Sequence, residues 1–346
     1  MNTSWLTYLN LEEELKECFN YVYFNDSDSQ QRVYSNKFAD ILLRASIEIE
    51  TLIKELYRRN GGTKRTDKIK FDAECLGYLD SLFDISKKVV FVAYPFFDFK
   101  NEKNKAIYPL SHFSMTDSNE WNKSYQDIKH DKLKNYKKGN LRVALHSLAA
   151  LFLLNVYFKD EEFTIKHGEV NTFDNRFGSS LFSLNKPSDK TGFFSNAYIS
   201  NESVYEYRLT DASQEEFKKQ HSDYMQRFMS YVSTVPEMHE TDFSLIVEGI
   251  TKQFSGVSLV MNYFNALAKY RVDKLFCGLS KDEKYKLLES KTGKQINDEN
   301  YEENYFILIL KEEQDYIHLF PPLFLHHALS DSLVRIFIPR INNDAN

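Results

Sequence analysis

The chain of 346 residues is longer than one hydrophobic core usually supports, and its 42% hydrophobic content is enough for it to fold throughout. A formal net charge of −6 excludes a uniformly basic, nucleic-acid-binding exterior and leaves only local basic patches. The three cysteines lack any CxxC spacing, which excludes a disulfide framework and a cysteine-based zinc site.

The first ninety residues are predicted to be largely helical. Residues 5–23 carry Leu11, Leu15 and Phe19 at four-residue steps, with the glutamates at positions 12 to 14 beside them as an expected solvated face. A second helix of about seven turns begins after Ser35, which can cap it, and ends before two glycines. A third helix follows at residues 71–88, and residues 89–93 fit either a short strand or a continuation of that helix.

The central part of the chain is predicted to be a long loop followed by a core helix. Prolines and asparagines between residues 94 and 123 indicate an ordered loop, and loops of that length are often functional. The next helix begins near Asn140 and contains the apolar run 148–154, which is too short to cross a membrane and predicts a buried segment. Because the first ten residues also lack a signal-peptide pattern, we expect a cytoplasmic protein without a membrane segment.

The C-terminal half changes character. Residues 158–210 contain short alternating stretches between turn residues and predict β or irregular structure. Helices are expected at residues 213–234 and 241–290, the second broken near Gly256 or Gly278, and a strand is expected at residues 305–310. The predicted fold class is therefore mainly α, with a helical bundle over residues 1–158 and an α+β region over residues 159–346.

The strongest candidate site lies at residues 125–132. The sequence has no dinucleotide-binding glycine motif, nucleophile elbow, HExxH motif or complete phosphate loop. His130 stands between Lys129 and Asp131, and an imidazole among cations can exchange protons near neutral pH while its neighbours hold a phosphate. The cations expected to bind an anionic substrate here are Lys123, Lys132, Lys134, Lys137, Lys138 and Arg142.

A second basic cluster follows the long helix. It could join the first cluster in one surface for an anionic ligand. The alternative is that both clusters are simply solvated, or complement the dipole of a helix C-terminus. The second cluster comprises Arg58, Arg59, Lys64, Arg65, Lys68 and Lys70.

The helix at residues 34–56, followed by Trp121, Tyr125, the segment 128–131 and a helix near Asn140, resembles the HEPN superfamily of helical-bundle proteins over residues 34–158. Many members are metal-independent ribonucleases of defence or toxin systems. The resemblance implies RNA as the substrate, no cofactor or metal, and a homodimer or another protein partner.

The resemblance also implies roles for particular residues. His130 would act as general acid or base while a 2′-hydroxyl attacks the neighbouring phosphate, and its neighbours Lys129 and Asp131 are also expected to be catalytic. Arg44 and Glu48 would contribute from the long helix. The family signature, an arginine followed after four to six residues by a histidine, is replaced here by Lys123 at the corresponding distance from His130. Lysine cannot make the planar bidentate phosphate contact of arginine.

Several alternatives remain open at this level. Arg44 and Glu48 could form a surface ion pair, and His146 could be a hydrogen-bonded core histidine. The whole chain could be a non-catalytic interaction or dimerisation module. A third alternative is a metal-dependent HD-type phosphohydrolase that uses His130, Asp131 and His112. Separately, His326, His327 and Asp331 could bind a metal ion, or the two histidines could simply be packing or surface residues.

Overall fold

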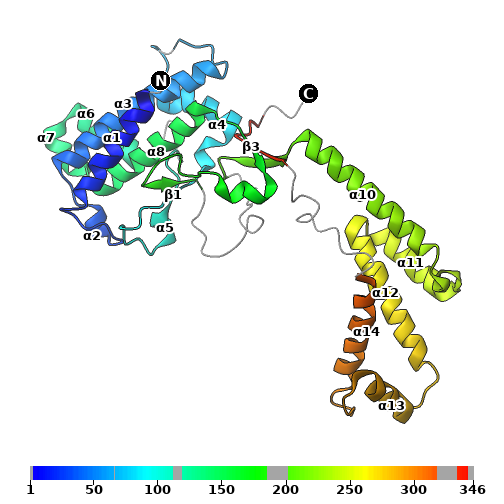
Figure 1. Cartoon of the computed structure of the whole chain (residues 1–346). Helices are drawn as coiled ribbons and strands as arrows, with labels where there is room; N and C mark the ends of the chain where they lie inside the picture. The colour runs from blue at the N-terminus through cyan, green and yellow to red at the C-terminus, as the bar shows by residue number, and fades with distance from the viewer. Residues whose placement is uncertain (1–2, 66, 112–118, 185–201, 318–332, 342–346) are drawn as a thin grey trace. The chain divides into compact units, whose positions relative to one another are not determined.

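The computed structural model describes residues 3–65, 67–111, 119–184, 202–317 and 333–341 (Figure 1). These residues are mainly helical with two small sheets, which confirms the predicted fold class. The chain divides into two compact units, unit 1 at Met1–Arg208 and Val334–Asn346, and unit 2 at Leu209–Leu333. The predicted boundary stood at residue 158, whereas in the structure residues 159–208 belong to the same unit as the N-terminal helices.

Unit 1 is built on two long helices that run side by side in the same direction. α3 (Asn36–Arg59) begins as predicted after Ser35, whose Oγ accepts a hydrogen bond from the Phe38 amide at 3.1 Å. At its start, the Ser35 amide donates to the Gly139 carbonyl at 3.2 Å, just ahead of α8 (Leu141–Lys159). At its end, Arg59 donates to the Phe158 carbonyl at 3.1 Å. Hydrogen bonds therefore join the two helices near both their starts and their ends.

α8 is the central core helix of unit 1. By length and composition it could cross a membrane, but 83% of the apolar window is buried within the fold. The apolar run at residues 148–154 is thus the buried middle of a longer helix. The amide of Val143 donates to the Asn140 side chain at 3.1 Å, so Asn140 caps α8.

The segment between α3 and α8 is more structured than the sequence indicated. The predicted third helix is a π-helical turn (Phe71–Cys75), α4 (Leu76–Phe83) and a 3-10 turn (Ile85–Lys87), and it is followed by the strand β1 (Val90–Val92). The predicted loop at residues 94–123 contains the short helix α5 (Glu102–Lys105), β2 (Ala106–Ile107) and the start of α6. β1 pairs antiparallel with β2 and with β4 (Phe182–Ser183).

Of the three glutamates of α1 (Thr3–Cys18) expected on a solvated face, Glu13 is exposed as predicted, whereas Glu12 and Glu14 are not. Glu12 is 1% exposed, and its Oε1 accepts hydrogen bonds from the Ser180 amide at 2.5 Å and the Leu181 amide at 2.8 Å. Glu14 is half-buried and binds Arg44. The prediction was wrong for both residues, because their partners lie on other elements of the fold.

Replacing Glu12 with alanine is expected to lower the free energy of unfolding of unit 1 by about 1–3 kcal/mol, because the Ser180 and Leu181 amides lose their bonds to Glu12 Oε1. The Leu181 amide keeps a bond of 3.2 Å to Ser179 Oγ. Glu13 is exposed, and its replacement with alanine is expected to change this free energy by no more than about 0.5 kcal/mol. The chain has 2 tryptophans, Trp5 and Trp121, both in unit 1, so tryptophan fluorescence in urea follows this unit. Equal effects of the two substitutions would contradict a stabilising role of the hydrogen bonds to Glu12.

Unit 2 is an insertion between two neighbouring strands. The second sheet has the order β3 (Phe163–Lys166), β6 (Leu333–Phe337) and β5 (Glu206–Leu209). The chain enters unit 2 after β5 and returns as β6. At this base the Thr210 amide donates to the Leu333 carbonyl at 3.1 Å, and the Leu333 amide donates to Ser213 Oγ at 3.0 Å.

Unit 2 consists of long helices, namely α10 (Asp211–Val232), α11 (Thr241–Gln253), α12 (Gly256–Phe276), α13 (Lys281–Thr292) and α14 (Tyr301–Ile317). Both predicted breaks occur, since α12 begins at Gly256 and Gly278 has φ +75° just after its end. The predicted strand at residues 305–310 is wrong. Leu308 and Ile309 are buried on one side of α14 while Phe306 is exposed, as helical spacing dictates.

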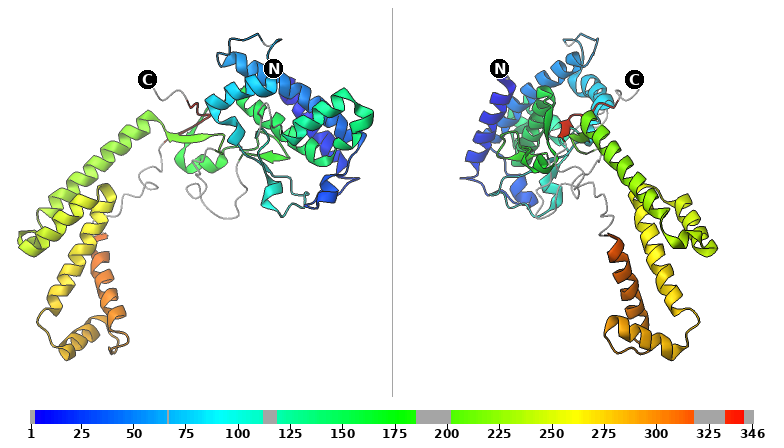
Figure 2. Two further views of the ribbon diagram at one scale, coloured as in Figure 1. Left: turned by 180° about the vertical axis from the view of Figure 1, so that it is seen from behind. Right: turned by 45° about the vertical axis from the view of Figure 1, so that its right-hand side comes forward.

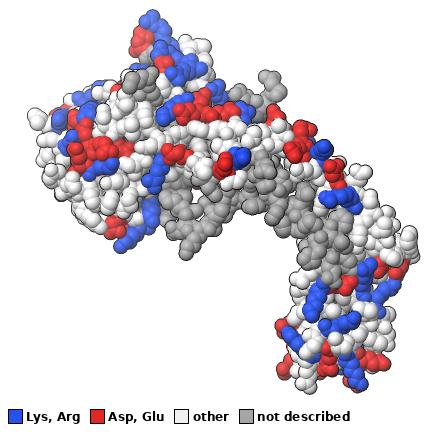
Figure 3. Space-filling view, viewed as in Figure 1, with Lys and Arg blue, Asp and Glu red and all other residues white. Residues whose placement is uncertain are grey.

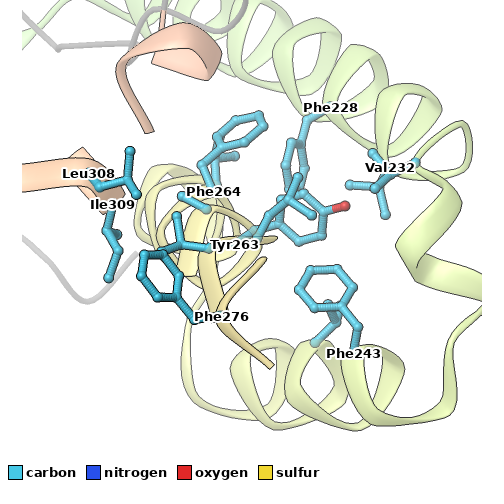
Figure 4. Close-up of a cluster of buried hydrophobic side chains, with 14 of the residues drawn as sticks. Phe228, Val232, Phe243, Tyr263, Phe264, Phe276, Leu308 and Ile309 are labelled. Atoms are coloured by element: carbon cyan, nitrogen blue, oxygen red, sulfur yellow. The ribbon is translucent and has the colours of Figure 1, made fainter. Parts of the chain in front are cut away.

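The core of unit 2 is largely aromatic (Figure 4). Phe228 of α10 meets Tyr263 and Phe264 of α12 with ring centroids 5.2 and 5.9 Å apart. Both views of Figure 2 show α12 and α14 side by side, and Leu308 and Ile309 of α14 belong to the same cluster. Aromatic residues make up 15% of the sequence, and part of them form the core of unit 2.

Candidate nucleic-acid interface

The predicted site lies at the end of a well-anchored helix, α6 (Glu120–His130). Trp121, Tyr125 and Ile128 are buried, and Trp121 Nε1 donates to the Pro109 carbonyl at 2.8 Å. With these three residues fixed on the inner side, Lys129 and His130 fall in the exposed last turn. The imidazole of His130, the predicted proton-transfer group, is therefore exposed to solvent at the end of the helix.

Asp131 has a structural role next to His130. It ends α6 and caps the short helix α7 (Lys132–Asn135), where its Oδ1 accepts a hydrogen bond from the Lys134 amide at 3.1 Å. This bond redirects the chain so that the following lysines stay on the surface. The predicted catalytic role of Asp131 stays a prediction.

The predicted lysines fall into two groups. Lys138 is paired with Asp127 at 2.5 Å, which neutralises it. Among the described residues Lys123, Lys132 and Lys134 are exposed and form no ion pair, while Lys129 lies 5.3 Å from the Tyr125 ring centre and Lys137 lies 6.0 Å from that of Tyr34. We call the group formed by Lys129, His130, Lys132, Lys134 and Lys137 the lysine surface.

Two tyrosines beside this surface were not predicted. Tyr34 and Tyr136 are 42% and 41% exposed, and their rings meet edge to face with centroids 5.3 Å apart. A hydrogen bond with the Tyr34 phenol raises the pKa of Tyr136. Tyr136 lies within the basic run, so the sequence could have indicated it. Tyr34 is distant in the sequence and is brought close by a backbone bridge between Tyr34 and Asn140.

Arg44 faces a different partner from the one expected. Its guanidinium binds Glu14 of α1 through two hydrogen bonds of 2.9 and 2.8 Å, and Asp40 at 3.2 Å. This contact lowers the pKa of Glu14. Arg44 thus joins α1 to α3 and forms no salt bridge with Glu48, and the catalytic roles predicted for Arg44 and Glu48 stay predictions.

Arg142 is not part of the lysine surface. It is half-buried in the first turn of α8, with its Nε 3.5 Å from Glu120 Oε2. Arg142 and His146 line a small, partly open pocket with Gln31 and Phe99. Burial lowers the pKa of His146 to about 4, and the positive charge of Arg142 adds to the effect. His146 is half-buried, and its imidazole forms no hydrogen bond with another described residue, so the predicted hydrogen-bonded core histidine stays a prediction.

The state of His146 predicts a pH dependence of stability. The imidazole is neutral in the folded chain down to about pH 4, whereas an unfolded histidine binds a proton below about pH 6.5. The stabilisation is present above pH 6.5 and is lost as the pH falls toward 4, by on the order of 2–3 kcal/mol. Urea unfolding at pH 7 and pH 4.5 should show a smaller pH effect in His146→Gln than in the wild type. An unchanged pH effect would contradict this role.

The second basic cluster is largely neutralised. Lys64 is paired with Glu74 at 2.7 Å, Arg65 with Asp67 at 2.9 Å, and Arg58 with Glu55. The cluster follows the end of α3. The lysine surface extends from the start of that helix, where Lys137 lies 6.0 Å from the Tyr34 ring centre, to Lys129, which lines a groove with Glu50 and Lys54. Ion pairing rather than distance therefore distinguishes the second cluster, and a joint surface of the two clusters stays a prediction.

The charged groups of the described residues form no candidate metal site. On the face in Figure 3, basic and acidic side chains are interspersed in both units. Within the described ranges, no three His, Cys, Asp or Glu side chains are grouped so that they could hold a metal ion. The predicted metal ligands His112, His326, His327 and Asp331 lie outside the described residues.

Comparisons with protein-family models, curated proteins and solved structures found no match for this chain. The likeness to HEPN proteins is therefore carried by the sequence features alone and stays a prediction.

Proposed function

We propose that this chain binds single-stranded RNA through the lysine surface and the Tyr34–Tyr136 pair. The observation that carries the proposal is the pair of exposed tyrosine rings, with Lys137 6.0 Å from the centre of the Tyr34 ring. Lysines that form no ion pair can neutralise phosphates, which is the main source of affinity for a nucleic acid. The surface requires neither a metal nor a cofactor.

The tyrosines favour a single strand over a duplex. Exposed aromatic rings bind RNA by stacking on its bases, which are accessible only where they are unpaired. Tyr136 stands between Lys134 and Lys137 in the sequence, so a base stacked on its ring would have lysines available for the neighbouring phosphates. A surface made of lysines alone would favour any polyanion.

Cleavage is a second proposal on the same surface. The exposed imidazole of His130 adjoins Lys129 in the last turn of α6, so it could transfer a proton on a phosphate that the lysines hold. Labelled RNA should be incubated with the protein with and without EDTA. Cleavage that resists EDTA and disappears in His130→Ala would support a metal-independent endoribonuclease, as in the defence proteins that the chain resembles.

The binding proposal predicts a specific effect of Tyr136→Ala. Loss of one stacking ring should weaken binding of a labelled single-stranded RNA by about 1–3 kcal/mol, measured by fluorescence anisotropy. Tyr21 is 88% exposed and lies outside the lysine surface, so Tyr21→Ala is the matched control and should bind RNA as the wild type does.

The results separate the proposal from its alternative. If the wild-type protein binds no RNA but sediments as a dimer, the RNA-binding proposal is replaced by that of a non-catalytic dimerisation module. Equal losses in the two tyrosine variants would remove the stacking role of Tyr136.

A further inference from the structure

A groove of about 480 Å³ lies between α3 and α6 and opens beside the lysine surface. α3 contributes Leu43, Ile47, Glu50, Thr51 and Lys54, and α6 contributes Tyr125 and Lys129. Its volume is within the range of about 300–1,000 Å³ typical of small-molecule sites. Lys129 belongs to both the groove and the lysine surface, so a strand held on the surface can reach the groove.

The groove has an apolar wall suited to a flat ring. Leu43 and Ile47 follow each other by one turn on α3, and Ile47 is 56% exposed although it is a large aliphatic residue. Tyr125 is 3% exposed and forms part of the wall on the α6 side. A planar heterocycle placed here would cover apolar surface that is otherwise in water.

The polar groups of the wall are a carboxylate and an ammonium side by side. Lys54 Nζ lies 2.7 Å from Glu50 Oε1, and the two side chains are 26% and 31% exposed. The hydroxyl of Thr51 is already used, since it donates to the Ile47 carbonyl at 2.9 Å. Recognition in this groove therefore depends on Glu50 as acceptor and Lys54 as donor.

This pair is complementary to one nucleobase edge in particular. Guanine presents two adjacent N–H donors, which a carboxylate can accept with both oxygens, next to a carbonyl oxygen that an ammonium can bind. Adenine and cytosine present one amino group beside a ring acceptor and use only part of the carboxylate. Uracil presents a single N–H between two carbonyls.

We infer that the groove is a binding site for a guanine base, with Lys129 at its mouth contacting the adjoining phosphate. The inference rests on the proposed function where the guanine belongs to RNA. A free guanine nucleotide has the same chemistry, and the experiment separates the two sources.

The test compares two labelled RNAs of equal length, one of adenines only and one with a single central guanine. The wild type should bind the guanine-containing strand at least about fivefold more tightly. Glu50→Gln should remove this preference while keeping the affinity for the adenine strand. Glu55→Gln is the matched control, because Glu55 lies on the same helix and is also in an ion pair but does not line the groove.

A second measurement does not depend on any variant. Guanosine 5′-monophosphate and adenosine 5′-monophosphate are titrated into the wild-type chain, and the methyl signals of Ile47 are followed by NMR. Selective shifts with the guanine nucleotide support the site.

The outcomes distinguish the two proposals. RNA binding with no guanine preference, and no Ile47 shift, overturns the inference and leaves the proposed function standing. Ile47 shifts without any RNA binding support a site for the free nucleotide and overturn the proposed function. Absence of both overturns both.

Discussion

Replacing Phe152 with alanine is expected to lower the free energy of unfolding of unit 1 by about 3–5 kcal/mol. Phe152 is fully buried in α8, and its ring lies 5.7 Å from that of Tyr8 and 5.8 Å from that of Phe182. These neighbours come from α1 and from β4, so the cavity left by truncation opens where three elements meet. The size of the loss follows from removing buried ring surface and leaving that cavity unfilled.

Urea unfolding followed by tryptophan fluorescence measures this loss in unit 1. Phe96→Ala makes the same truncation at a ring that is 61% exposed, and it should cost no more than about 1 kcal/mol. A loss below 1 kcal/mol for Phe152→Ala would mean that α8 is not the centre of the core.

Changing Lys129, Lys132 and Lys134 together to glutamine is expected to weaken RNA binding by on the order of 10- to 100-fold. The three ammonium groups are exposed and form no ion pair among the described residues, so phosphates are their available anionic partners. Each phosphate contact on a single strand contributes about 0.7 to the slope of log affinity against log salt. The slope should therefore become shallower by about 2.

A matched triple variant controls for net charge. Lys219, Lys269 and Lys286 are exposed in unit 2, and changing them to glutamine alters the total charge by the same amount. This variant should keep the wild-type affinity and salt slope. Equal losses in the two triple variants would show that binding follows overall charge, and the lysine surface would lose its assigned role.

Elements governed by neighbouring residues were predictable from the sequence. α3 has a clear apolar stripe, a capping serine and glycines after its end, and the structure places it as predicted. The stretch at residues 305–310 was assigned wrongly because a short apolar run fits a strand or a buried helix equally well. The burial of Glu12 could not be predicted, since its partner Ser180 is 168 positions away.

The candidate site was predictable to a similar extent. The exposure of Lys129 and His130 follows from the local spacing of buried residues on α6. The meeting of Tyr34 with Tyr136, the pairing of Arg44 with Glu14, and the groove beside Lys129 all depend on how separate helices pack. Such contacts join residues far apart in the sequence, and no local pattern encodes them.

The insertion of unit 2 between β5 and β6 sets an order of events during synthesis. β6 is the middle strand of its sheet, yet the ribosome makes it after the whole of unit 2. The helices of unit 2 pack mostly on near neighbours in the chain, so this unit can fold while it emerges. Until β6 is made, β3 and β5 lack the strand that lies between them. Their unpaired edges can then form hydrogen bonds with other strands, so the nascent chain is prone to mispairing at that stage.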